Sequence, residues 1–348
     1  MSFTHPALVL LHLGAFAFFI ALAVCGFMIH AGVRDIPVER SSHDHIVPTA
    51  GGVGLVAAVG AALAAQSLFY PGVVDRQFMG PMCALAFALA SLGLWDDIAE
   101  VSTKLKFALI AIVCGLTVWV IGPPTHLPLA TGALAIPYPL GFAGAMLWVF
   151  VIINTVNFMD GINGFMAGVL SVSFVFVCAV AILAGNETSA VLSFMSACAL
   201  WGFLPYNAKR KADLFCGDTG SLFIGYIFAI STLYLVTRSE QTNLLYIAPL
   251  LILPFLVDVL LTLLGRARAG KNLLSAHRDH LYQRLFDRIG NPIVVTALYI
   301  FVSTLTGLLT LAVVGAGLHT SLFFFLFLVG LLSSLYLLIG RALNIDAG

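Results

Sequence analysis

Residues 144–183 read GAMLWVFVIINTVNFMDGINGFMAGVLSVSFVFVCAVAIL. Two apolar runs flank the polar segment NFMDGINGF at residues 157–165, and both have the composition of membrane-spanning helices. A turn between two membrane helices needs polar and flexible residues, but it does not need an aspartate together with two asparagines. The segment therefore predicts two membrane-spanning helices whose connection also carries chemistry.

The rest of the chain repeats this apolar pattern. Of its 348 residues, 61% are hydrophobic and 9% are charged, whereas soluble domains have about 25% charged residues. The net charge of zero gives no sign of nucleic-acid binding. The N-terminus lacks the basic region and cleavage site of a signal peptide, so the first apolar run is expected to remain as a helix.

Eleven apolar stretches have roughly the length of a membrane span. They lie near residues 6–30, 50–70, 78–95, 105–122, 140–157, 164–184, 190–206, 219–237, 244–265, 293–315 and 320–340. The third, fifth and seventh are short enough for one of them to be tilted or partly re-entrant. The expected fold is all-α, a polytopic integral membrane protein with about 11 transmembrane helices. We expect a single domain over residues 1–348, with the motifs in 30–290 and two C-terminal spans in 293–340.

Basic residues predict the orientation of these spans. The loops after the odd-numbered spans share one side, and they hold 14 of the 16 basic residues. These are Arg34, Arg40, Lys104, Lys106, Lys209, Arg210, Lys211, Arg266, Arg268, Lys271, Arg278, Arg284, Arg288 and Arg341. Only Arg76 and Arg238 fall on the other side. The positive-inside rule therefore places the basic side in the cytoplasm and the N-terminus outside.

The cysteines give no sign of a disulfide framework or a zinc site. Five of the six lie in apolar runs, and no two form a CxxC pair. They are Cys25, Cys83, Cys114, Cys178, Cys198 and Cys216. Buried free thiols are expected at these positions, and Cys216, in the polar segment FCGDTG, is interpreted as a packing residue.

Polar clusters gather on the predicted cytoplasmic side. They read SSHDHIVPTAGG, LWDDIAEVSTKLKF, NFMDGINGF, PYNAKRKADLFCGDTGS and GRARAGKNLLSAHRDHLYQRL. Four carboxylates lie at or near predicted helix ends, at Asp96, Asp97, Asp160 and Asp218. Neighbouring carboxylates repel unless a cation or a proton resolves the charge. Magnesium takes one or two carboxylates together with substrate phosphates, so the clusters predict a site for a phosphorylated substrate at the membrane surface.

Each cluster also has a purely structural interpretation. Asp96 and Asp97 can simply end a helix at the interface, and Asp218 can cap the eighth span. The glycines of DGING can be turn formers, the basic loops can be topology signals, and His277 and His280 can be an ordinary interfacial pair. Their coincidence in five loops on one side favours a functional site.

Five ordered motifs resemble one enzyme family. The motifs are PTAGG at 48–52, DDIAEVSTKLKF at 96–107, NFMDGINGF at 157–165, GDTGSLFIG at 217–225 and HRDHLYQRL at 277–285. Together they resemble the polyprenyl-phosphate N-acetylhexosamine-1-phosphate transferases, from about residue 30 to 290. This family includes the phospho-MurNAc-pentapeptide translocase and the GlcNAc-1-phosphate transferases that start O-antigen and teichoic-acid synthesis.

The resemblance implies a function. The family transfers a sugar-1-phosphate from a UDP-sugar to undecaprenyl or another polyprenyl phosphate and releases UMP. The product is the lipid-diphosphate-sugar that starts lipopolysaccharide O-antigen or other cell-wall polysaccharide synthesis. The resemblance also implies Mg²⁺, with Mn²⁺ as a substitute, and a bacterial inner membrane with the active site facing the cytoplasm. A homodimer is left open.

The resemblance also implies site residues. The expected catalytic residues are Asp96, Asp97 and His280, and the expected metal ligands are Asp97 and Asp218. The expected substrate-binding residues are Asn157, Asp160, Asn163, Lys104, Lys106, Asn207, Phe215, His277 and Arg278. Asn163 departs from the family, which usually has Asp there. The segment HRDHLYQR replaces the run of three histidines of the translocase, which favours the surface-polysaccharide branch.

Asp258 lies within the apolar segment LLILPFLVDVLLTLLG. A charge inside a membrane span is costly and is a functional-site hypothesis by default. Both a structural pairing role and a substrate role stay open for it from the sequence.

Other classes compete with the transferase. A secondary transporter also has many spans and an intramembrane carboxylate, but its site is expected at the midplane and no repeated halves are visible. A CDP-alcohol phosphatidyltransferase would need a series of aspartates that does not follow DGINGF. The peptidoglycan phospho-MurNAc-pentapeptide transferase is the alternative within the family.

Overall fold

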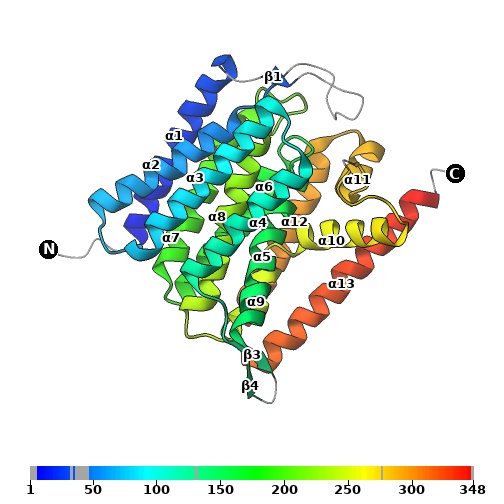
Figure 1. The fold of residues 1–348 in the computed structure, drawn as a ribbon. Coiled ribbons are helices and arrows are strands. Elements are labelled where there is room, and N and C mark those ends of the chain that lie inside the picture. Colours follow the sequence, from blue (N-terminus) through cyan, green and yellow to red (C-terminus); the bar gives the residue numbers. More distant parts are fainter. Residues whose placement is uncertain (1–5, 32–33, 36–46, 130–131, 276, 346–348) are drawn as a thin grey trace.

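The structure is a computed structural model that describes residues 6–31, 34–35, 47–129, 132–275 and 277–345. The described residues form helices and two short antiparallel hairpins (Figure 1). The first helices are α1 (Pro6–Ala31), α2 (Gly51–Phe69), α3 (Arg76–Ala99), α4 (Thr103–Ile121) and α5 (Tyr138–Phe158). They are followed by α6 (Phe165–Leu183), α7 (Glu187–Asn207), α8 (Gly217–Arg238), α9 (Leu244–Leu250) and α10 (Leu253–Arg268). The last are α11 (Leu281–Ile289), α12 (Pro292–Val313) and α13 (Leu318–Ile345).

The hairpins pair β1 (Arg34–Asp35) with β2 (Val47–Pro48), and β3 (His126–Leu129) with β4 (Gly132–Ala135). The sequence did not predict either hairpin or the short helix α11. The first hairpin and α11 lie at one end of the helix bundle, and the second hairpin lies at the opposite end (Figure 1).

The expectation of an all-α polytopic membrane protein is confirmed. Among the described residues, 10 helices are long and apolar enough to cross a membrane, or up to 11 if one bent pair is counted as a span. These helices coincide with the predicted apolar stretches apart from a few residues at their ends. The third, fifth and seventh stretches form the unbroken helices α3, α5 and α7.

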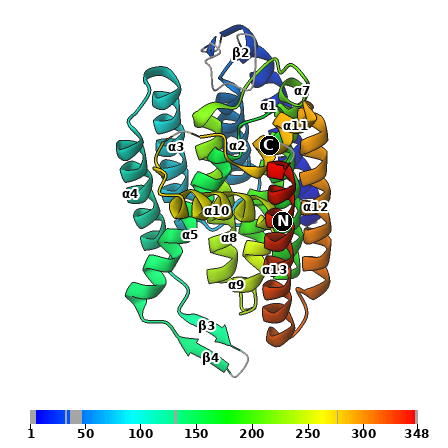
Figure 2. The same cartoon turned by 90° about the vertical axis from the view of Figure 1, so that its right-hand side faces the viewer.

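The break falls instead in the ninth stretch, and the single helix expected over residues 244–265 is wrong. This stretch forms α9 and α10, which meet at an angle of 77°. Pro249 lies in the last turn of α9 and Pro254 in the first turn of α10. Proline cannot donate a backbone hydrogen bond and is tolerated in the first turn of a helix, so this pair favours a stop and a restart. Both views show α10 lying across the bundle axis (Figures 1 and 2).

Helix α8 forms the centre of the bundle. In its apolar stretch 94% of the residues are buried inside the protein, compared with 6% in α13 at the periphery (Figure 2). Helices α2, α3, α5 and α7 all pack against α8. The first turn of α8 is therefore reached by residues from several other helices.

The PTAGG motif binds the segment that leads into α8. Gly51 and Gly52 donate backbone hydrogen bonds of 2.9 Å to the carbonyl oxygens of Phe215 and Cys216. Phe215 N donates to Pro48 O at 2.8 Å. Residues 41–46 of the first polar cluster lie outside the described residues. All six cysteines lie within the described part and are free thiols, as predicted.

Candidate active site

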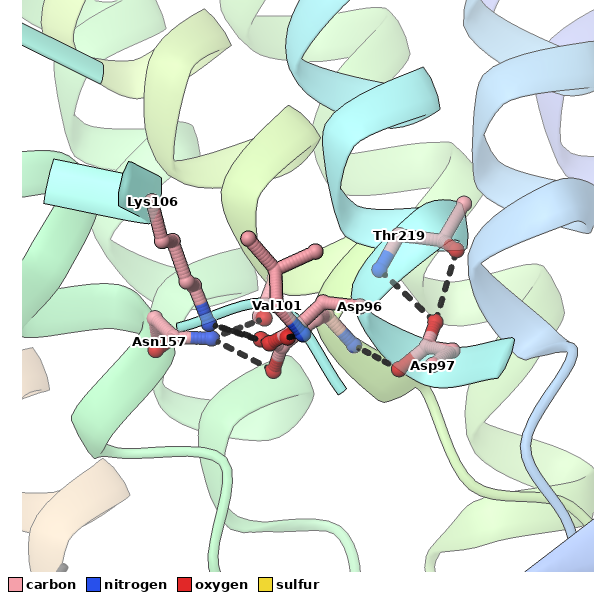
Figure 3. Close-up of polar contacts among 8 residues, drawn as sticks. Asp96, Asp97, Val101, Lys106, Asn157 and Thr219 are labelled. Carbon is pink, nitrogen blue, oxygen red and sulfur yellow. Dashed lines mark hydrogen bonds and ion pairs between the residues drawn. The ribbon is translucent and has the colours of Figure 1, made fainter. Parts of the chain in front are cut away.

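Asp97 binds the beginning of α8. Asp97 Oδ1 accepts the backbone N–H of Asp218 at 2.8 Å, and Oδ2 accepts the backbone N–H of Thr219 at 3.0 Å and its hydroxyl at 2.7 Å (Figure 3). A carboxylate at this place satisfies two of the amides that a helix leaves unpaired in its first turn. Gly93, one turn earlier on α3, makes the close approach possible, because a Cβ there would lie 2.3 Å from Asp218 O.

Lys106 connects Asp96 with Asp218. Its ammonium lies 2.9 Å from Asp96 Oδ2 and also forms an ion pair with Asp218 Oδ2 (Figure 3). The other oxygen of Asp96 accepts the backbone N–H of Val101 at 2.6 Å, in the turn between α3 and α4. The turn between α3 and α4 therefore places Lys106 of α4 beside Asp96 and Asp218.

Asn157, in the last turn of α5, completes this group. Its Nδ2 donates to Asp218 Oδ1 at 2.8 Å and to Ser221 Oγ at 2.9 Å. Four helices, α3, α4, α5 and α8, therefore contribute polar side chains to one cluster at the end of the bundle (Figure 3). We call Asp96, Asp97, Lys106, Asn157 and Asp218 the carboxylate cluster.

Asp160 lies beside the carboxylate cluster, in the connection between α5 and α6. Burial, together with the negative charges of Asp218 and Asp97, raises the pKa of the Asp160 carboxyl from 3.8 to about 8. Burial is the largest cause, and the two neighbouring carboxylates act in the same direction, so both favour the neutral form of Asp160.

The last polar loop brings two histidines together. The rings of His277 and His280 lie 4.9 Å apart between centroids, and the ring of His280 lies 6.0 Å from that of Phe158. Burial and the nearby charges of His280 and Arg266 lower the pKa of His277 to about 4. His280 is 3% exposed, and its Nδ1 lies 3.4 Å from Asp258 Oδ1.

Comparisons with known proteins match the part of the chain that carries this cluster. Residues 79–236, which contain the whole carboxylate cluster, match the family model for glycosyl transferase family 4. The chain is 28% identical over 266 residues to a probable undecaprenyl-phosphate N-acetylglucosaminyl 1-phosphate transferase of Bacillus subtilis, covering 74% of this chain and 70% of the relative. It is 26% identical over 264 residues to the undecaprenyl-phosphate alpha-N-acetylglucosaminyl 1-phosphate transferase of Escherichia coli K12, covering 72% and 68%.

A third relative is the decaprenyl-phosphate N-acetylglucosaminephosphotransferase of Mycobacterium tuberculosis H37Rv, 27% identical over 321 residues, with 84% of this chain and 76% of the relative covered. These matches support a similarity of this chain to the polyprenyl-phosphate N-acetylhexosamine-1-phosphate transferase family. The resemblance inferred from the five sequence motifs is confirmed.

Magnesium is the cation that this family implies, and the donor set fits it. Among the residues that the structure describes, no three His, Cys, Asp or Glu side chains form a ready-made metal site. Asp96 and Asp218 instead share the ammonium of Lys106, so a positive charge already lies where a cation would bind. Magnesium needs only one or two carboxylates when substrate phosphates supply further oxygens. Both oxygens of Asp97 already accept hydrogen bonds from α8. Its role as a metal ligand therefore stays a prediction.

Two asparagines predicted to bind substrate connect polypeptide segments in the structure, and their substrate role stays a prediction. Asn207 is buried; its Oδ1 accepts Gly164 N–H at 2.7 Å and its Nδ2 donates to Leu214 O at 2.9 Å. Asn163 Nδ2 donates to the carbonyl oxygens of Lys209 and Arg210 at 2.9 and 3.2 Å. Both side chains hold the DGING loop against the segment between α7 and α8, outside the carboxylate cluster.

The remaining predicted residues lie around the carboxylate cluster. Lys104 is exposed at the start of α4, and half-buried Phe215 binds the PTAGG motif through its backbone. Arg278 pairs with Asp287 of α11 at 2.7 Å. Cys216 is 1% exposed, and burial raises the pKa of its thiol well above the usual value, which fits a packing role.

Three residues of the site were not identified from the sequence. Thr219 and Ser221 bind Asp97 and Asn157, and the only signal for them was their place in the GDTGS motif. Tyr282 is fully buried, and its hydroxyl donates to Phe158 O at 2.9 Å. The sequence singled out its neighbours His277 and His280. The contact of Tyr282 with the NFMDGINGF loop is visible only in the tertiary structure.

Proposed function

We propose that this protein transfers an N-acetylhexosamine-1-phosphate from a UDP-sugar to a polyprenyl phosphate in the membrane, with release of UMP. The observation that carries the proposal is the bridge from Lys106 to Asp96 and Asp218 beside Asn157. This group lies within the segment that matches the family model, at one end of a bundle of membrane-spanning helices. A lipid phosphate reaches such a position without its tail leaving the bilayer.

The reaction is one phosphoryl transfer. An oxygen of the lipid phosphate attacks the sugar-bearing phosphorus of the donor and forms a new P–O–P bond. The bond from that phosphorus to the oxygen bridging toward uridine breaks, and UMP leaves with the electron pair. The lipid phosphate is already ionised near neutral pH, so positioning and charge stabilisation matter more than a strong base.

Residues of the carboxylate cluster suit these needs. Lys106 donates charged hydrogen bonds, and an incoming diphosphate competes with Asp96 and Asp218 for its ammonium. Asp96 and Asp218 would hold Mg²⁺, which stabilises negative charge on the transferring and leaving phosphates. His280 and Lys104 supply further donors at the edge of the site.

The donor is proposed to be UDP-N-acetylglucosamine or a related UDP-N-acetylhexosamine. The relatives named above are N-acetylglucosamine-1-phosphate transferases. The last loop reads HRDHLYQR, without the three adjacent histidines of the peptidoglycan enzyme. The site is proposed to face the cytoplasm of a bacterial inner membrane, since 14 of the 16 basic residues fall on the predicted side that carries it.

The test is UMP release by the purified protein in detergent. The reaction contains undecaprenyl phosphate, Mg²⁺ and either UDP-N-acetylglucosamine, another UDP-N-acetylhexosamine or UDP-MurNAc-pentapeptide. Omission of lipid, donor or metal provides the controls, and Asp218→Asn provides an inactive variant of the same fold. UMP release that requires both lipid and donor supports the transferase, and the donor used identifies the branch.

Folded protein that releases no UMP with any donor and binds no UDP would overturn the proposal. Uptake of a solute into proteoliposomes by the same preparation would then support the transporter class. Release that continues after complete removal of divalent cations would leave the transferase in place and remove magnesium from it.

A further inference from the structure

Helix α11 begins without the side-chain cap that its own sequence should supply. Its N-cap residue is His280, whereas Ser, Thr, Asp and Asn are the preferred caps. Among the described residues, the His280 side chain accepts no hydrogen bond from the first turn of α11. The unpaired amides of this turn are satisfied from another helix.

Asp258 of α10 supplies this cap. Its Oδ1 accepts the backbone N–H of Leu281 at 2.9 Å, and its Oδ2 accepts that of Tyr282 at 3.0 Å. The carboxylate also accepts the hydroxyl of Tyr299 at 2.6 Å and contacts the hydroxyl of Thr262 at 3.4 Å. Asp258 is 1% exposed, so these contacts and the positive end of the α11 dipole offset its loss of hydration.

Because Asp258 caps α11, the His280 ring does not bind the backbone amides of the helix and lies beside Asp258 instead. His280 Nδ1 is buried without a hydrogen-bond partner among the described residues and lies 3.4 Å from Asp258 Oδ1. No hydrogen bond joins the two groups, but this carboxylate is the charged group that faces Nδ1, and it favours the tautomer whose Nδ1 proton points toward Asp258. Nε2 is then the nitrogen available to a substrate.

The capped helix is also fixed to the connection that carries Asp160. The ring of Tyr282 stacks on Phe165 at 4.4 Å, and its hydroxyl binds Phe158 O, next to Asn157. Gly161 leaves room for this contact, because a Cβ there would lie 2.1 Å from the tyrosine oxygen. Asp258 therefore determines where His280 lies relative to the carboxylate cluster.

We propose that Asp258 is a positioning residue that caps α11 in place of His280 and holds the His280 imidazole for the substrate phosphates. The proposal rests on the transferase function given above. A direct substrate role for Asp258 does not fit, since both carboxylate oxygens are occupied by donors from the protein.

The first experiment measures hydrogen–deuterium exchange in the Asp258→Asn variant in detergent. The amide side chain has one acceptor oxygen for two backbone N–H groups, so one of them faces a second N–H donor. Exchange in peptides covering residues 277–285 is expected to rise at least about tenfold, because the first turn of α11 opens locally. Peptides from α3 and α8 are expected to exchange as in the wild type.

Asp75→Asn is the matched control. Asp75 also caps a helix, accepting Gln77 N–H at 2.9 Å, and also accepts a tyrosine hydroxyl, that of Tyr234, at 2.9 Å. It lies at the opposite end of α3 from Asp97. An asparagine can keep both contacts, because its oxygen can accept Gln77 N–H while its NH₂ group donates to the Tyr234 hydroxyl. Unchanged exchange of residues 277–285 in Asp258→Asn would overturn the proposal, whether or not the protein proves to be a transferase.

The second experiment is a double-mutant cycle on UMP release. Asp258→Asn is expected to lower kcat about 10- to 100-fold, because a misplaced group loses its catalytic contact. In a His280→Ala background the same change is expected to cost less than about twofold, since Asp258 acts through His280. Losses that multiply would mean that Asp258 acts independently, and would overturn the proposal.

A further variant tests the proposal in case Asp258→Asn does not fold. Tyr299→Phe removes one hydrogen bond from the same carboxylate, and its loss of kcat is expected to be smaller and likewise absent in the His280→Ala background. A wild-type protein without UMP release would contradict the proposed function, and the exchange data would still decide the role of Asp258.

Discussion

Asp97 on α3 accepts both the backbone N–H and the hydroxyl of Thr219, at 3.0 and 2.7 Å, although 121 residues separate the two in the chain. Within the carboxylate cluster, Asp97 thus fixes the first turn of α8. Asp96 has a different role, since it shares Lys106 with Asp218.

Asp97→Asn is expected to lower both stability and turnover. The amide offers one acceptor for two backbone donors, and the loss of a charged cap costs about 1–2 kcal/mol. The midpoint of thermal unfolding in detergent should fall together with UMP release. Asp96→Asn is the matched variant and should lose turnover with a smaller change in the unfolding midpoint. Equal unfolding midpoints for the two variants would contradict the capping role.

Lys106→Met is expected to lower kcat about 100- to 1,000-fold, as removal of one preorganised donor does in other transfer sites. Lys104→Met makes the same change at an exposed position two residues away and should cost less than about fivefold, since an exposed charge is worth under about 1 kcal/mol. Lys106→Arg keeps the charge and should recover part of the loss. Similar losses at both lysines would mean that only the net charge of the loop matters.

Asn207→Ala is expected to lower the stability of the fold more than the rate of the reaction. It leaves Gly164 N–H and Leu214 C=O buried without a partner, at about 1–3 kcal/mol each. The unfolding midpoint should fall by several degrees, with the donor KM of the folded fraction nearly unchanged. Asn163→Ala loses more exposed bonds and should be milder. A large rise in donor KM with an unchanged midpoint would support the substrate-binding role predicted from the sequence and contradict a purely structural one.

The raised pKa of Asp160 predicts a pH effect. Between pH 3.8 and about 8 the folded protein holds a proton on Asp160 that the unfolded chain releases, so the free energy of unfolding falls as pH rises through this window and levels off above it. Asp160→Asn stays neutral throughout. In chelator-treated protein, the unfolding midpoint of the variant minus that of the wild type should therefore grow from pH 5 to pH 8. Parallel curves would contradict the shift.

The orientation is testable by labelling of introduced cysteines. Ala133→Cys lies on the exposed strand β4, and Arg210→Cys lies at the end that carries the carboxylate cluster. An impermeant maleimide should label the first in intact cells and the second only after permeabilisation. The unmodified protein is the control, because five of its six free cysteines are buried and Cys83 is half-buried. The reverse pattern would place the site outside.

The sequence identified residues better than it identified their roles. Asp96, Asp97, Asn157 and Asp218 were selected by motif, and the structure brings them together. Asn163 and Asn207 were selected in the same way, yet their amides hold loops together. An amide that binds a ligand and an amide that binds backbone have the same chemistry, so spacing along the chain does not separate them.

Composition and hydropathy by themselves determined that the chain is an all-α membrane protein, because the cost of placing unpaired backbone groups in lipid leaves few alternatives to long apolar helices. Motif order indicated the family that the chain resembles. Tertiary structure alone decided that the ninth stretch breaks into α9 and α10, that Asp97 caps α8, and that Asp258 caps α11 beside His280. Each of these depends on the packing of segments that are far apart in the sequence. Contacts between such segments produce no hydrophobic periodicity and no local residue preference from which they could be predicted.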